Sequence, residues 1–108
     1  YLDRTGEARA SFSTIGRNFP AWAETVRDAV SFVEREPGVD PRRIGVLGVS
    51  LGGALALVAA AGDRRIKAVA DYFGFLPQYL AESGARLPPT LILHGARDAI
   101  VPVANAYA

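Results

Sequence analysis

Apolar residues return every three or four positions between residues 22 and 33. Charged residues fall mostly on the opposite side of this segment, which is typical of an amphipathic helix with one buried face. Asn18 and Pro20 predict where the helix starts, because proline fits the first turn, where its missing N–H costs nothing. Pro37 and Gly38 predict its end. The apolar side consists of Trp22, Val26, Ala29, Val30 and Val33.

Three later runs are apolar and predict strands, Ile44–Val49, Ile66–Phe73 and Thr90–Gly95. We expect the first and the third to be buried, the first on both faces of a parallel sheet, because it shows no alternation. Segment 51–61 is rich in alanine and apolar all round, so it predicts a buried helix, ended by Gly62. The other expectations are loops over residues 1–17 and 74–89, with a short helical turn around Gln78–Glu82, and a helix that starts near Pro102.

The order of these elements is helix, strand, helix, strand, loop, strand. This order predicts an α/β fold, a mostly parallel sheet with flanking helices. Functional sites of such sheets open at the carboxyl ends of the strands. The sequence contains no internal repeat and no linker-like run, so residues 1–108 are expected to form part of one continuous domain.

Composition narrows the classes of function. The 108 residues are 50% hydrophobic and 21% charged, as in an ordinary globular domain, and the net charge of +1 gives no reason to expect a nucleic-acid partner. The absence of cysteine excludes disulfides, thiolate catalysis and cysteine-metal sites. A single histidine excludes a multi-histidine metal centre within one chain. We therefore expect no metal, and the sequence implies no organic cofactor.

No segment approaches the roughly 18 consecutive apolar residues of a membrane-spanning helix, and no signal-peptide pattern opens the chain. We expect no membrane partner and a cytoplasmic location. The chain begins at Tyr1 without a methionine and ends within a segment expected to be helical. These two features lead us to expect a piece of a larger domain, whose exposed sheet edges would favour self-association.

Gly48-Val49-Ser50-Leu51-Gly52 matches the nucleophile-elbow pattern G-x-S-x-G, in which a serine stands at a sharp strand-to-helix turn. The pattern follows a predicted strand and precedes a predicted helix, as the motif requires. Side chains at Gly48 and Gly52 are expected to collide with the tight turn. The backbone N–H of Leu51 would then point at a developing oxyanion. The alternative for Ser50 is a capping residue in a glycine-rich turn.

Asp98 follows the third predicted strand, at the same sheet edge as Ser50. A carboxylate there can orient a histidine and stabilise its protonated form. The alternative is a loop aspartate that makes a turn. Asp71 is the second candidate for the acid, although its position inside a predicted strand favours a packed or capping side chain.

Residues 37-PGVDPRRIGVLGVSLGGALALVAAAGDRRIKAVADYFG-74, together with 88-PPTLILHGARDAIVP-102, resemble the α/β-hydrolase superfamily, and more narrowly its dienelactone hydrolase-like branch. The resemblance implies a mostly parallel sheet and a triad of Ser or Cys, Asp and His. By this resemblance Ser50 is the nucleophile, Leu51 the oxyanion-hole amide and Asp98 the acid. Dienelactone hydrolases usually have cysteine as nucleophile, so the serine favours a general carboxylic ester hydrolase.

The triad histidine would follow the acid in this family, but no histidine follows Asp98. His94 precedes it and is interpreted as a structural residue at a strand end, hydrogen-bonded locally. The chain is therefore expected to hold the central part of one α/β-hydrolase domain, without the catalytic histidine. We expect these 108 residues alone to have little or no esterase activity.

Three functions remain open. The first is a serine hydrolase of small carboxylic esters or lactones, which acts through an acyl-enzyme on Ser50. The second is a peptidase or acyltransferase, because elbow geometry is shared across these chemistries. The third is a non-catalytic binding module, in which the elbow is only architecture.

Overall fold

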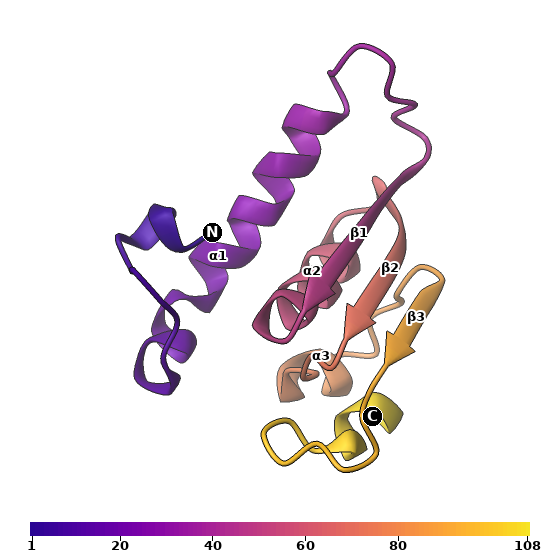
Figure 1. Cartoon of the computed structure of the whole chain (residues 1–108). Coiled ribbons are helices and arrows are strands. Elements are labelled where there is room, and N and C mark those ends of the chain that lie inside the picture. Colours follow the sequence, from indigo (N-terminus) through magenta and orange to yellow (C-terminus); the bar gives the residue numbers. More distant parts are fainter.

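Three parallel strands, Ile44–Val49 (β1), Ile66–Tyr72 (β2) and Thr90–Leu93 (β3), form one sheet in this order, and their carboxyl ends lie at the same edge (Figure 1). The computed structural model describes all residues, 1–108. The elements are the 3₁₀ helix η1 (Leu2–Thr5), α1 (Phe12–Val33), β1 (Ile44–Val49), α2 (Leu51–Gly62), β2 (Ile66–Tyr72), α3 (Gln78–Glu82), β3 (Thr90–Leu93) and the 3₁₀ helix η2 (Val103–Tyr107). This is the α/β fold class that the sequence predicts.

The elements from β1 to β3 agree with the sequence prediction to within two residues. Strand β1 has the predicted bounds, and α3 coincides with the short turn expected around Gln78–Glu82. The last element differs in type, because residues 103–107 form a 3₁₀ helix. The local pattern of apolar residues is sufficient to predict these elements, since each apolar segment is short and has glycine or proline nearby.

The prediction for the start of α1 is wrong. The helix begins at Phe12, after Ser11 in an extended conformation, and the Ser11 N–H donates to Thr14 Oγ1 at 3.2 Å. This contact at the first turn resembles one half of a capping box. Pro20 lies inside the helix, where it removes only one internal hydrogen bond, the one to the carbonyl of Gly16. A proline can thus mislead a boundary prediction when an earlier cap exists.

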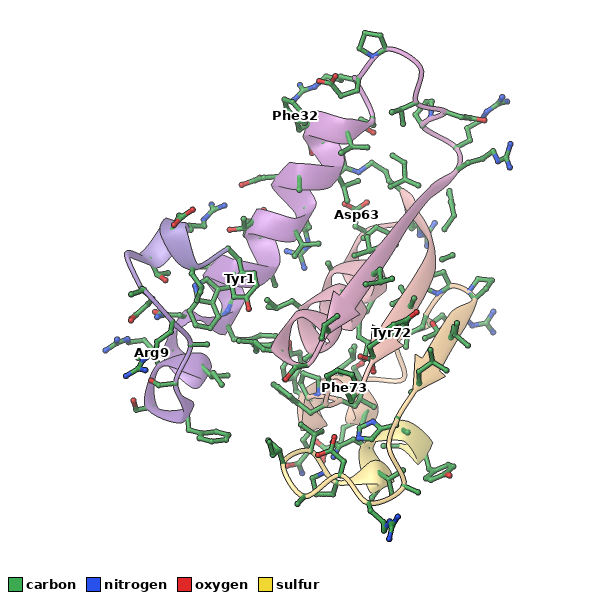
Figure 2. All side chains as sticks on the ribbon, in the orientation of Figure 1. Tyr1, Arg9, Phe32, Asp63, Tyr72 and Phe73 are labelled. Carbon is green, nitrogen blue, oxygen red and sulfur yellow. The ribbon has the colours of Figure 1, made fainter.

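The N-terminal segment is also more ordered than the loop expected there. Trp22 of α1 is completely buried, and its Nε1–H donates to Thr5 Oγ1 at 2.8 Å. The ring of Tyr1 packs on the Trp22 indole with centroids 5.4 Å apart, and Figure 2 shows Tyr1 directed toward α1. These contacts hold η1 against α1 by aromatic packing and one partly buried hydrogen bond.

One face of the sheet is covered and the other is not. Helix α2 packs on β1 and β2, and α1 packs on α2, so both lie on the same side (Figure 1). Leu47 of β1 is 60% exposed and Leu91 of β3 is 55% exposed. The predictions that β1 is buried on both faces and that β3 is buried are therefore wrong for these residues. Burial on the second face requires a layer that residues 1–108 do not supply.

The core lies between α2, the covered face of the sheet and the inner side of α1. Helix α2 is buried almost all round, as its composition predicts. The largest apolar cluster joins Val30, Ile44, Ala56, Leu57, Ala59, Ala60, Ile66, Val69 and Leu80. Because α2 is central to this cluster, the core fixes the position of its N-terminus relative to the strand ends.

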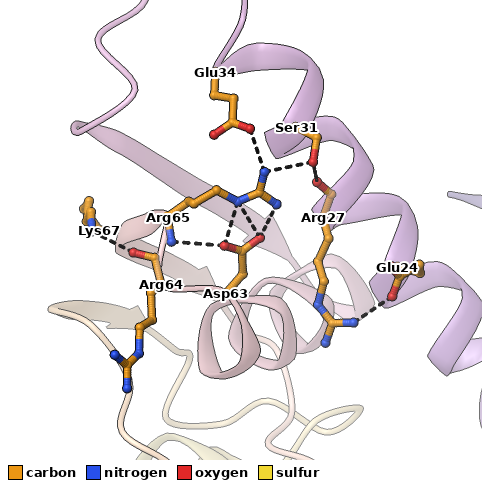
Figure 3. Close-up of polar contacts among 8 residues, drawn as sticks. All are labelled: Glu24, Arg27, Ser31, Glu34, Asp63, Arg64, Arg65 and Lys67. Carbon is orange, nitrogen blue, oxygen red and sulfur yellow. Dashed lines mark hydrogen bonds and ion pairs between the residues drawn. The ribbon is translucent and has the colours of Figure 1, made fainter.

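A charged network connects the end of α1 to the turn before β2, at the opposite end of β2 from the carboxyl-terminal strand ends (Figure 3). The Arg65 guanidinium donates to both oxygens of Asp63 and, at 2.8 Å, to Glu34 just beyond the end of α1. It also donates to Ser31 Oγ at 2.9 Å. The hydrogen bond from Arg65 lowers the pKa of Asp63 below its ordinary value. None of the helices has the length and apolar character needed to cross a membrane.

Candidate active site

Ser50 stands at the junction between β1 and α2 in a strained conformation. Its φ is 54° and its ψ is −121°, and Ser50 and Phe73 are the only non-glycine residues with positive φ. A serine held in this region is uncommon and indicates a conformation that the surrounding structure imposes. Its side chain is exposed, while the next residue, Leu51, is buried. Ser50 thus stands at a sharp strand-to-helix turn, the position at which the sequence predicts a nucleophile elbow.

Backbone hydrogen bonds hold this turn on both sides. The Ser50 N–H donates to the carbonyl of Tyr72 at the end of β2, at 2.9 Å. The Ser50 carbonyl accepts from the N–H groups of Gly53 and Ala54 in the first turn of α2. The N–H of Leu51 is one of the first four of the helix, which have no acceptor within it. It is therefore available to an anion at the helix N-terminus.

The elbow glycines have unequal roles. A Cβ on Gly48 would overlap the backbone of Gly52 and Gly53, well under 3.0 Å away, so glycine is required there. A Cβ on Gly52 would meet no atom within 4 Å. The expectation of a collision at Gly52 is wrong, because its Cα–Cβ direction points away from the strand.

Two further glycines are sterically confined, for a reason that the motif does not reveal. A Cβ on Gly53 or on Gly74 would overlap the carboxylate of Asp71, which is 2% exposed. Asp71 Oδ1 accepts the N–H of Gly74 at 3.0 Å, next to the strained Phe73. Figure 2 shows Phe73 at the carboxyl-terminal edge of the sheet. Asp71 is packed, as the sequence suggests, and its carboxylate lies between the first turn of α2 and the turn after β2.

Burial raises the pKa of Asp71 above its ordinary value, and this effect outweighs the Gly74 N–H and the nearby His94, both of which lower it. The signal that could have located this contact is an aspartate near the end of a largely apolar strand, followed by Tyr-Phe-Gly. Glycines 53 and 74 carry no such signal, because their partner is distant in sequence.

Asp98 lies in the loop that follows β3. Its Oδ1 accepts the N–H groups of Ile100 and Val101, at 2.8 and 2.9 Å. The hydrogen bonds from Val101 and then Ile100 lower the pKa of Asp98, so the carboxylate is ionised at neutral pH. Asp98 therefore stabilises a turn, as in the alternative interpretation of a loop aspartate. Its Oδ2 accepts no backbone hydrogen bond.

His94 has the local contacts expected of it. Its ring is 2% exposed, and Nε2 lies 2.8 Å from the carbonyl oxygen of Val101. A carbonyl only accepts, so Nε2 carries the hydrogen. Nδ1 is buried without a partner, and Asp98 Oδ2 is 3.8 Å from Nε2. Neither nitrogen is hydrogen-bonded to Ser50.

A cleft of about 260 Å³ opens beside Ser50. Seven of its nine lining residues are hydrophobic, and none is charged. Ile100 and Val101 line it, so the loop held by Asp98 borders the same space as the serine, although Asp98 itself does not line it. The lining residues are Ala10, Ser11, Phe12, Ile15, Ser50, Leu51, Phe75, Ile100 and Val101. No group of three or more His, Cys, Asp or Glu residues is placed to hold a metal ion.

The strand order, the strained serine and the helix N-terminus behind it define part of a domain of the α/β-hydrolase type. The sequence pattern of the dienelactone hydrolase family matches residues 3–107. This chain belongs to the dienelactone hydrolase family.

Known proteins share parts of this sequence and fold. Thiohydrolase aneE from Aspergillus aculeatus is 48% identical over 42 residues, which are 39% of this chain and 13% of that protein. Polyketide transferase ATR5 from Stachybotrys chlorohalonatus is 52% identical over 46 residues, 43% of this chain and 16% of that protein. A solved structure named m3DLH has a TM-score of 0.74 and 26% identity, and the match covers 89% of this chain and 40% of that one. The matched part is thus a minor fraction of each of these proteins.

Proposed function

We propose that Ser50 is the nucleophile of a hydrolase that acts on carboxylic esters or lactones in the whole protein. The observation that carries the proposal is the strained, exposed Ser50 at the start of a buried helix. Strain of this kind persists where the surrounding structure maintains it, and it is common at catalytic residues. Membership in the dienelactone hydrolase family and relatives named as hydrolases support the same reading.

The reaction would proceed through an acyl-enzyme. Ser50 Oγ attacks the ester carbonyl carbon, its proton passes to a general base, and the carbonyl oxygen becomes an oxyanion near the Leu51 N–H. Collapse breaks the bond to the leaving oxygen, which takes the proton from the base. Water, deprotonated by the same base, then attacks the acyl carbon, and Ser50 leaves with its proton restored.

The general base is proposed to be a histidine outside residues 1–108. His94, the only histidine of the chain, donates from Nε2 to Val101 and buries Nδ1. Asp98 would orient the imidazole of that histidine and stabilise its positive charge through Oδ2. Two observations favour this acid over Asp71. Asp98 has a lowered pKa, and its loop borders the cleft at Ser50.

Acyl transfer or thioester hydrolysis is the second candidate. The names of two relatives, a thiohydrolase and a polyketide transferase, favour it. Both reactions would use the same acyl-enzyme, with a thiolate as leaving group or with an acceptor in place of water.

The test is to label the whole protein with a fluorophosphonate and to measure hydrolysis of p-nitrophenyl acetate. We expect label on Ser50, with loss of labelling and an at least ~10³-fold loss of kcat/KM in Ser50→Ala. Unchanged turnover in Ser50→Ala would overturn the proposal and favour a non-catalytic role for the elbow.

A further inference from the structure

The cleft at Ser50 continues into a longer apolar groove. A second hollow of about 330 Å³ shares five lining residues with it, among them Ile15 and Phe75. A third hollow of about 280 Å³ shares Ile15, Gly16 and Phe75 with the second. Tyr79 lines the far hollow. The three hollows therefore adjoin one another along the first half of α1, from the nucleophile to the start of α3.

The lining of this groove is chemically uniform. No charged side chain lines any of the three hollows, and the only polar side chains are Ser11, Ser50, Asn105 and the Tyr79 hydroxyl. Two large apolar residues border it with unusual exposure, Phe12 at 91% and Ile100 at 81%. An anionic ligand would find no cation here, whereas an alkyl chain would cover these exposed surfaces.

We propose that this groove binds the apolar acyl chain of an ester or thioester substrate, with the carbonyl at Ser50 and the chain extended toward Tyr79. The inference rests on the proposed function, because it takes Ser50 as the nucleophile. It adds that the substrate class is acyl groups of medium length, and that residues of α1 and of the loop after Asp98 select them. Continuity of the groove with Ser50 argues for a substrate chain as the occupant.

The expected selectivity follows from burial of methylene groups. Each fully buried methylene is worth about a four-fold gain in binding. A groove open to solvent on one side recovers only part of this gain. We therefore expect kcat/KM of the whole protein to be at least about 10-fold higher for p-nitrophenyl octanoate than for the acetate.

Gly16 offers a way to block the groove without disturbing the fold. A Cβ at Gly16 meets no atom within 4 Å, and its φ is ordinary for a helix. Replacing glycine within a helix also removes its unfavourable helix propensity. Gly16→Trp should lower the ratio of kcat/KM for octanoate over acetate by at least about 10-fold, because the indole occupies the second and third hollows.

The matched control is Ala29→Trp, about 20 Å along α1 from Gly16. Ala29 is exposed, so its assignment to the buried face of this helix is wrong, and the same ring is placed at the surface. This variant should leave the ratio as in the wild type. A flat profile from acetate to octanoate, or equal ratios in the two tryptophan variants, would overturn the groove proposal while Ser50-dependent acetate hydrolysis still supports the function. Absence of Ser50-dependent hydrolysis of every ester would overturn the function itself, and with it the inference.

Discussion

The carboxylate of Asp71 lies directly against Gly53, so close that a Cβ on that glycine would overlap Oδ1. The two residues are 18 positions apart, one in β2 and one in the first turn of α2. The contact joins the strand-to-helix turn after Ser50 to the end of the neighbouring strand. The same carboxylate accepts the N–H of Gly74, so it connects both turns at this edge of the sheet.

Gly53→Ala should destabilise the protein. The added methyl group overlaps Asp71, and overpacking of this kind typically costs 1–3 kcal/mol, so we expect about 2 kcal/mol. Gly52→Ala is the matched control, since its Cβ meets open space and alanine is the better helix former. Urea denaturation of both variants measures the difference. Equal stability of the two would show that the Asp71 contact relaxes without cost.

Asp71→Asn should change the pH dependence of stability. Burial raises the folded-state pKa above the ordinary 3.8, so the folded state binds the proton more tightly than the unfolded state. The stability contributed by the protonated acid is complete below pH 3.8 and is lost as pH rises through the folded pKa. The asparagine variant lacks this loss and keeps an oxygen for the Gly74 N–H.

Denaturation of wild type and Asp71→Asn at steps from pH 4 to pH 7 measures this effect. The wild type should lose stability relative to the variant as pH rises through that window. A difference in stability that stays constant with pH would contradict the prediction.

Asp63→Asn should weaken the connection between α1 and the turn before β2. Asp63 is buried and accepts several hydrogen bonds from Arg65, and breaking charge-assisted bonds of this kind costs about 1–3 kcal/mol. The folded pKa is lowered, so this stabilisation is present above pH 3.8 and disappears as pH falls through the folded pKa. Asp28→Asn, at the exposed pair with Arg4, serves as control and should cost less than about 1 kcal/mol.

Thermal or urea denaturation at pH 7 and at pH 3 distinguishes the two variants. The difference in the free energy of unfolding between wild type and Asp63→Asn should be large at pH 7 and smaller at pH 3. A difference of the same size at both values would assign the loss to packing and not to charge.

Asp98→Asn should reduce activity far more than stability. Asparagine Oδ1 can still accept the two backbone N–H groups, whereas the charge that would orient a catalytic imidazole is lost. By analogy with other triads we expect kcat/KM to fall about 10³–10⁴-fold. Ester hydrolysis and urea denaturation are measured on the same preparations of the whole protein. If kcat/KM falls at least as much in Asp71→Asn as in Asp98→Asn, the role of the triad acid would pass to Asp71.

Residues 1–108 as an isolated polypeptide should self-associate through the bare face of the sheet. Leu47 and Leu91 lie on this face and are more than half exposed, and apolar patches of this kind promote association. Replacing both with lysine should shift the sedimentation profile toward the monomer. Replacing Phe32, which is exposed on α1 away from the sheet, serves as control. A monomeric wild-type polypeptide would contradict the prediction.

The sequence by itself determined the local elements and the place of the elbow. Ile44–Val49 and the alanine-rich helix after Ser50 follow from short apolar runs bounded by glycine and proline, and the G-x-S-x-G spacing marks the turn between them. These features depend on neighbours within a few residues. The start of α1 is predicted wrongly because Pro20 is a more conspicuous boundary signal in the sequence than Ser11 and Thr14, which form the contact at the first turn.

Only the tertiary structure decided which glycines are sterically confined and which surfaces are covered. Gly52 belongs to the motif yet faces open space, whereas Gly53 is confined by Asp71, which comes from another strand. The bare side of the sheet and the apolar groove beside Ser50 likewise depend on elements brought together by folding. The physical reason is that burial and steric contact arise between segments that are distant along the chain. A local pattern of residues therefore does not predict them.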